Sequence, residues 1–195
     1  MKLYEKLPCH VTANGRKYQI DLDFRNVLRM LEVMARDDLM PGARAFLALK
    51  CVMRRPPKDA GALLEALRAM LFPAQKRGNE KRLTSFEQDA DLIRAAFRQA
   101  YGIDLYRDKL HWLEFTALLS ALPDGSRYSE VLGIRARPMP AATKYNQQER
   151  EWLAKAKAAC ALEMSEAERE RAYSEGVKAV VSGLLAWIEG SEKHG

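Results

Sequence analysis

The feature that most constrains the fold is a predicted helix, about Lys109 to Leu122, that is apolar on almost every side. Its apolar residues are Leu110, Trp112, Leu113, Phe115, Ala117, Leu118, Leu119 and Leu122. A helix without a polar face must be surrounded by other elements. We therefore expect the rest of the chain to pack around this helix.

A second helix is predicted directly before it. Thr84 with Glu87, or Ser85 with Gln88, matches the capping box that begins a helix. Gly102 suits the left-handed position that ends one. The apolar face of this helix comprises Phe86, Ala90, Ile93, Phe97 and Tyr101.

Two polar residues lie within this apolar pattern. Asp89 falls between Ala96 and Ala100 on the apolar side of its helix, where a carboxylate needs hydrogen bonds or a cation. We expect it to be a structural anchor, with Arg135 or His111 as its partner, because no second group beside it in sequence supports a general base. His111 itself is more typical of a core or edge residue than of a metal ligand, since a metal needs three or four ligands.

The N-terminal quarter predicts a small β-hairpin. Residues 9–13 and 16–20 alternate in polarity and are joined by Asn14-Gly15, the strongest short signal for a hairpin turn. A hairpin this short is not stable alone. We expect it to dock on helices or to pair with another chain.

Three helices are predicted after the hairpin. Asp21 or Asp23 caps the first. The second extends from Pro41 to about Met53, and the third covers about residues 59–71. We expect the second helix to bury Phe46, Leu49 and Val52.

A basic loop follows at residues 74–82, with a candidate basic patch of Lys76, Arg77, Lys81 and Arg82. Contact with phosphate is one interpretation. Few charges are involved, however, and no aromatic residue is interleaved for base stacking. The net charge of +6 is spread along the helices. We therefore do not expect nucleic acid as a partner.

The C-terminal part begins with a short helix, Ser129 to Leu132, that we expect to end at Gly133. Residues 136–144 predict a linker, and residues 145–195 a helical arm with helices at about 146–161 and 165–189. The arm either folds back to complete the core or stays mobile and binds a partner or another copy. Its candidate partner-binding residues are Trp152, Tyr173, Val177, Val181, Leu184, Trp187 and Ile188.

The expected fold class is mainly α: a compact helical bundle with a small N-terminal hairpin and a C-terminal helical hairpin or arm. Residues 1–135 form the predicted core domain of the 195-residue chain. Three widely spaced cysteines argue against a disulfide framework, and no apolar run approaches the length of a membrane span. No nucleophile–base pair, phosphate-binding glycine loop or metal spacing is recognisable. We therefore expect no enzymatic activity, no cofactor and no metal.

Several motifs occur in an order typical of one family. They are LYEKLP at the N-terminus, DFR at 23–25, FEQDADLIRAAFRQAYGIDL, LHWLEFTALLSAL and LGIRAR. In this order and spacing the chain resembles the gene-product-15 proteins of bacteriophages over about residues 1–140. The motif residues are Phe86, Asp89, Phe97, Tyr101, Gly102, Asp104, His111, Trp112, Phe115, Gly133 and Arg135.

The resemblance implies a role in tail morphogenesis of long-tailed phages, in the bacterial host cytoplasm. Genes of the family typically lie between those for the major tail protein and the tape-measure protein. The expected function is a tail-assembly chaperone or adaptor for the tape-measure protein, with the major tail protein and self-association as further partner expectations. The alternatives are a structural component retained in the particle and, less favoured, a nucleic-acid-binding phage protein.

Overall fold

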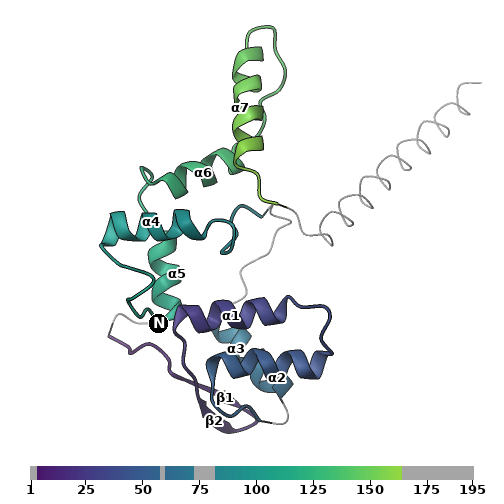
Figure 1. Ribbon diagram of the computed structural model, residues 1–195, viewed down its shortest axis with the longest axis vertical. Helices are drawn as coiled ribbons and strands as arrows, with labels where there is room; N and C mark the ends of the chain where they lie inside the picture. Colours follow the sequence, from purple (N-terminus) through teal and green to yellow (C-terminus); the bar gives the residue numbers. More distant parts are fainter. Residues whose placement is uncertain (1–3, 58–59, 73–81, 164–195) are drawn as a thin grey trace, which may run out of the picture.

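The computed structural model describes residues 4–57, 60–72 and 82–163, and Figure 1 shows their arrangement. The order of elements is β1 (His10–Ala13), β2 (Arg16–Gln19), α1 (Phe24–Met34), α2 (Pro41–Val52), α3 (Ala60–Leu71), α4 (Ala90–Tyr101), α5 (Trp112–Ser120), α6 (Arg127–Ala136) and α7 (Gln147–Ala159). The predicted fold class, mainly α with a small N-terminal hairpin, is confirmed.

The hairpin forms where the sequence predicts it. Asn14 and Gly15 have φ angles of 48° and 72°, the positive values that a tight hairpin turn needs at both central positions. Val11 and Ala13 of β1 are buried, and β1 packs against α3. Docking on a helix is thus how this hairpin covers its apolar side.

Helix α2 packs against both α1 and α3, and α3 packs against the hairpin. Asp23 caps α1 by accepting a hydrogen bond from the Arg25 backbone N–H at 3.0 Å. Leu49 and Val52 of α2 are buried as expected, but Phe46 is 36% exposed. The prediction for Phe46 is wrong because α2 is apolar on more than one side, and only the side with Ala48, Leu49 and Val52 is fully buried.

Helix α5 joins the two halves of the core, although it is shorter than predicted. Its Phe115 ring stacks on Phe24 of α1 and on Phe97 of α4, with centroid distances of 4.7 and 5.3 Å. Residues just before α5 are extended, because Leu110 O accepts from Phe24 N and Trp112 N donates to Leu22 O. These two bonds take the backbone groups that a longer helix would use. Outside Trp112 and Phe115, the apolar residues of α5 are not fully buried.

Helix α4 also begins later than predicted, at Ala90 and not at Thr84 or Ser85. Ser85 Oγ does accept from the Gln88 N–H at 3.3 Å, so half of the expected capping box is present. The return bond comes from a different residue, since Asp89 Oδ2 accepts from the Ser85 N–H at 2.9 Å. This exchange makes residues 85–89 a separate turn. At the other end, Gly102 ends the helix with a φ of 70°, as predicted.

Helix α6 is longer than predicted and passes through Gly133 to Ala136. Glycine in a helix interior costs only about 1 kcal/mol relative to alanine, so it does not by itself end a helix. The cap is Ser126, whose Oγ accepts from the Ser129 N–H at 3.2 Å. The extra turn places Arg135 within the helix, facing the rest of the molecule.

Residues 137–146 lie alongside α7, and they include most of the predicted linker at 136–144. Arg137 pairs with Glu149 at 2.9 Å, and the Arg150 guanidinium donates to the carbonyl of Pro140. We call residues 137–160 the α7 projection, because Figure 1 shows them extending away from the other helices. The second arm helix, predicted at 165–189, lies outside the described residues.

Candidate functional site

A buried ion pair between Asp89 and Arg135 holds the C-terminal elements together. The pair is bidentate, with Arg135 Nη1 at 2.7 Å from Asp89 Oδ2 and Nη2 at 2.8 Å from Oδ1. The Asp89 side chain is 1% exposed and that of Arg135 is 11% exposed. The sequence left Arg135 and His111 open as partners, and Arg135 is the one observed.

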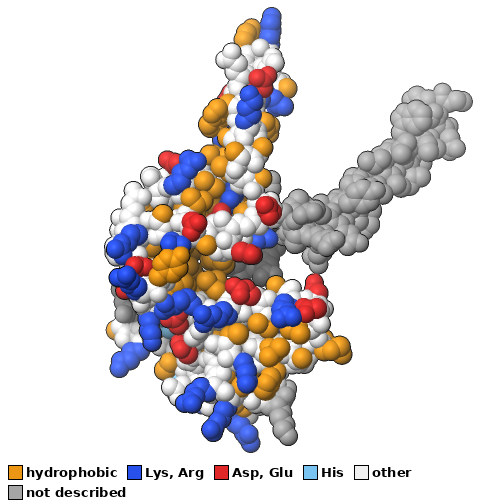
Figure 2. All heavy atoms as spheres, in the orientation of Figure 1, with side chains coloured by type: hydrophobic (Ala, Val, Ile, Leu, Met, Phe, Trp, Pro, Cys, Tyr) orange, Lys and Arg blue, Asp and Glu red, His pale blue; other side chains and the backbone are white. Residues whose placement is uncertain are grey.

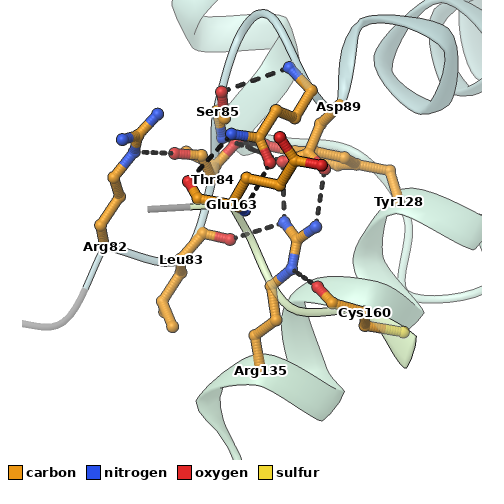
Figure 3. Close-up of polar contacts among 10 residues, drawn as sticks. Arg82, Leu83, Thr84, Ser85, Asp89, Tyr128, Arg135, Cys160 and Glu163 are labelled. Atoms are coloured by element: carbon orange, nitrogen blue, oxygen red, sulfur yellow. Dashed lines mark hydrogen bonds and ion pairs between the residues drawn. The ribbon is translucent and has the colours of Figure 1, made fainter. Parts of the chain in front are cut away.

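The same guanidinium also binds two backbone carbonyls from distant parts of the chain. Nη1 donates to Leu83 O at 2.9 Å, and Nε donates to Cys160 O at 2.6 Å. Figure 3 shows these bonds converging on Arg135. One side chain therefore ties the segment before α4 and the end of α7 to α6.

Further polar contacts surround the pair. Thr84 Oγ1 lies 2.9 Å from the Tyr128 hydroxyl and 3.4 Å from Asp89 Oδ2. The Gln88 side chain accepts from the Glu163 N–H at 2.7 Å and donates to the Glu163 carbonyl at 3.1 Å. Arg135 thus holds the end of the α7 projection at Cys160, and Gln88 of the 84–89 segment holds Glu163 just after it.

The electrostatics of Asp89 favour a permanent charge. Burial raises the pKa of this carboxyl, but hydrogen bonds from Arg135, the Ser85 backbone and Thr84 outweigh it and leave the pKa below the ordinary value. Both oxygens accept hydrogen bonds from these groups. A carboxylate occupied in this way is suited to holding structure and leaves little capacity for accepting a proton from a substrate.

His111 is a helix cap at the junction of the two halves of the core. Its Nδ1 accepts from the Leu113 N–H at 3.1 Å, so the ring hydrogen lies on Nε2, which donates to Pro8 O at 2.9 Å. Both ring nitrogens are thereby used. Across residues 4–57, 60–72 and 82–163, no three His, Cys, Asp or Glu side chains gather as a metal site would need.

The aromatic motif residues form one packed cluster. Trp112 lies 5.9 Å from Phe86 and 5.8 Å from Phe115 between ring centroids. Its indole Nε1 is buried without a hydrogen-bond partner among the described residues. Phe97 stacks in the same cluster and contacts Tyr101 edge-on at 5.6 Å.

The remaining motif residues hold local backbone. The Tyr101 hydroxyl donates to Leu118 O at 2.9 Å and so links α4 to α5. Asp104 Oδ1 accepts from the Tyr106 N–H at 3.0 Å, and its Oδ2 lies 3.4 Å from Arg98 Nη1. The motif that points to the family is therefore a set of core and capping residues.

The first exposed surface belongs to the α7 projection. Trp152, a candidate partner-binding residue, is 55% exposed, and Tyr145 and Met139 are exposed beside it in the chain. Only Leu153 of α7 is fully buried. Neither Tyr145 nor Met139 was predicted as a partner-binding residue, because Met139 falls in the predicted linker and Tyr145 lies just before the first predicted helix of the arm. The other candidates, Tyr173, Val177, Val181, Leu184, Trp187 and Ile188, lie outside the described residues.

A second exposed apolar surface lies on α2, where Met40, Phe46 and Leu47 are all exposed. The signal for it was present in the sequence, since α2 carries apolar residues on more sides than its neighbours can cover. Figure 2 shows hydrophobic side chains on this part of the molecule.

A shallow groove of about 420 Å³ lies between α4 and the residues that follow it. The Arg94 guanidinium sits 3.7 Å from the centre of the Tyr106 ring and pairs with Asp91 at 2.8 Å. These side chains satisfy one another across the groove, so it offers no free charge.

Of the candidate basic patch, Lys76, Arg77 and Lys81 lie outside the described residues. Arg82 is exposed and donates from Nε to the Thr84 carbonyl at 3.3 Å. None of the helices in the described ranges combines the length and hydropathy that a bilayer crossing requires.

A family model described as Bacteriophage Gp15 protein matches residues 3–162. The chain belongs to this family. The match extends past residue 140, where the resemblance in the motifs ends, and it takes in the α7 projection. Comparison with curated proteins and with solved structures found no match. Membership of the Gp15 family makes this a phage protein. The matched residues include the elements that meet at Arg135.

Proposed function

We propose that this Gp15-family protein is a non-enzymatic tail-assembly chaperone or adaptor that binds the tape-measure protein during tail morphogenesis. The family supports a phage role, and the α7 projection supports a role in binding another protein. The observation that carries the proposal is the 55% exposure of Trp152 on a helix that projects from the molecule.

The physical reason for the proposal lies in the apolar surface of the client and in the exposed side chains of the α7 projection. A long helical client with apolar stripes is an aggregation hazard until tail subunits cover it. Tryptophan is among the residues that most often dominate binding energy at protein interfaces. Trp152, Tyr145 and Met139 are each exposed on the α7 projection and offer apolar side chains to a partner. Such a surface favours a moderate interface that exchanges when tail subunits arrive.

Co-expression of the full chain with the tape-measure protein of the same phage tests the proposal. We expect the two proteins to co-purify and the soluble fraction of the tape-measure protein to rise. Trp152→Ala should weaken the complex by about 2 kcal/mol, some 30-fold in Kd, as for an interface hot spot.

Tyr106→Ala is the matched control, because Tyr106 is an exposed aromatic residue on a different element. It should leave the complex intact. Absence of any complex, or equal loss with both variants, would contradict the proposal. Mass spectrometry of purified particles separates a chaperone, which should be scarce there, from a retained tail component.

A further inference from the structure

The exposed face of α2 has a composition unlike that of the other described helices. Met40, Phe46 and Leu47 are 77%, 36% and 40% exposed. Positions 40, 43, 47 and 50 follow helical spacing, so Met40, Leu47 and Lys50 share one side with Ala43, and Phe46 borders them. The α2 face, meaning Met40, Ala43, Phe46, Leu47 and Lys50, is apolar over most of its length.

The charged residues at and just after the C-terminal end of this face are basic, whereas Asp37 and Asp38 lie before its first residue and Asp37 pairs with Arg44. Helix α2 contains no acidic residue. Lys50 Nζ lies 5.9 Å from the Phe46 ring centre, and Arg54 and Arg55 follow the helix directly. Within the described part of the chain, none of these three cations pairs with a carboxylate. The α2 face therefore ends in positive charge that no described carboxylate pairs with.

We propose that the α2 face is a docking surface for an amphipathic helix whose apolar stripe is flanked by carboxylates. The apolar side chains of α2 form a ridge at helical spacing, which packs best against the grooves of another helix. Carboxylates beside the incoming stripe would meet Lys50, Arg54 and Arg55, and complementary charge sets partner choice and register.

That the docking helix belongs to the tape-measure protein rests on the proposed function. The α2 face lies at the end of the molecule away from the α7 projection, as Figure 1 shows. The two surfaces can therefore be altered separately. Their partners can be tested separately as well.

Two synthetic peptides provide the probe. Both carry the same leucine stripe in a helix-forming sequence and a fluorescein label, but one has glutamates flanking the stripe and the other has lysines. Binding to the full-length protein is measured by fluorescence anisotropy at low and high salt. We expect the glutamate peptide to bind at least about tenfold more tightly, with a preference that shrinks as salt rises.

Variants of the α2 face locate the binding. Phe46→Glu with Leu47→Glu should weaken the glutamate peptide by about tenfold or more. Lys50→Glu with Arg54→Glu should reverse the preference between the two peptides. Tyr106→Glu introduces the same charge at an exposed aromatic position elsewhere and should change nothing. Thermal unfolding of each variant verifies that the fold is retained.

Equal affinity for the two peptides, no binding, or binding that survives the α2 variants would overturn the inference. So would binding of vesicles containing phosphatidylserine in preference to the glutamate peptide, because that would make the face a membrane surface. The tape-measure co-purification tests the proposed function alone: a complex without peptide binding overturns only the α2 inference, and the reverse result overturns only the chaperone role.

Discussion

At the residue scale, the Asp89–Arg135 pair shows why a carboxylate can occupy a buried motif position. A carboxylate on an apolar helix side requires a cation, and the cation arrives from a helix more than forty positions later in the chain. Arg135 then uses its other donors on Leu83 O and Cys160 O. The two residues are thus joined in a network, and the loss of either leaves buried polar groups without partners.

Asp89→Asn is expected to destabilise the fold by about 3–5 kcal/mol at neutral pH, because it leaves the Arg135 charge buried and uncompensated. Urea unfolding followed by circular dichroism measures the change. The double variant Asp89→Leu/Arg135→Met is the control: Leu83 O and Cys160 O lose their donor, but it should cost less than Asp89→Asn because no buried charge is stranded.

The pH dependence of the free energy of unfolding provides a second test of the Asp89–Arg135 pair. Since the pKa of Asp89 is lowered in the folded protein, its contribution is complete above the ordinary carboxyl pKa and is lost as pH falls through the lower folded value. The difference in free energy of unfolding between wild type and Asp89→Asn should therefore shrink on acidification. A difference that stays constant down to strongly acid pH would show that the pair does not stabilise the fold through its charge.

At the element scale, two glycines with different backbone conformations show what ends a helix. Gly102 has a φ of 70° and ends α4, whereas Gly133 lies inside α6. An added Cβ meets no atom within 4 Å at either position. Any difference between substitutions at the two sites must therefore come from backbone conformation.

Gly102→Ala should destabilise the protein by about 1–2 kcal/mol, because alanine is disfavoured in the left-handed region. Gly133→Ala should stabilise it by about 0.5–1 kcal/mol, because alanine has the higher helix propensity. Thermal or urea unfolding of both variants measures the pair. Similar effects of the two substitutions would contradict the assignment of their backbone roles.

At the scale of the whole molecule, the buried motif residues separate two exposed surfaces. The aromatic cluster joins α1 to α4 and α5, and the Asp89–Arg135 network joins the start of α4 to α6 and the end of α7. The α2 face and the α7 projection lie at different ends of the molecule (Figure 1). Of the motif residues, Asp89, Phe97, Trp112 and Phe115 are buried, and the exposed side chains of the α2 face and of the α7 projection are not among the motif residues.

The two proposals together make a prediction at this scale. If both surfaces contact the same tape-measure protein, the losses of affinity from Trp152→Ala and from Phe46→Glu/Leu47→Glu should add within about 0.5 kcal/mol, because the sites share no partners within this chain. Titration of the co-purified complex with the three variants measures this. A strongly non-additive result would mean that the surfaces are coupled through the fold.

The sequence by itself determined the local features whose causes are local. The Asn14-Gly15 turn, an aspartate cap at position 21 or 23 and the left-handed Gly102 each follow from the conformations that those residues favour. The family motifs could be recognised too, because order and spacing are properties of the chain. The need of Asp89 for a partner was visible, but two partners remained open.

Only the tertiary structure decided the rest, because it depends on segments that meet from far apart. Backbone bonds from Leu22 and Phe24 keep the start of α5 extended, and Asp89 replaces Gln88 in the turn before α4. The choice of Arg135, the exposure of Phe46 and the projection of α7 depend on which helix faces find neighbours. Periodicity shows that a helix has an apolar side, but only packing shows which apolar side chains stay uncovered.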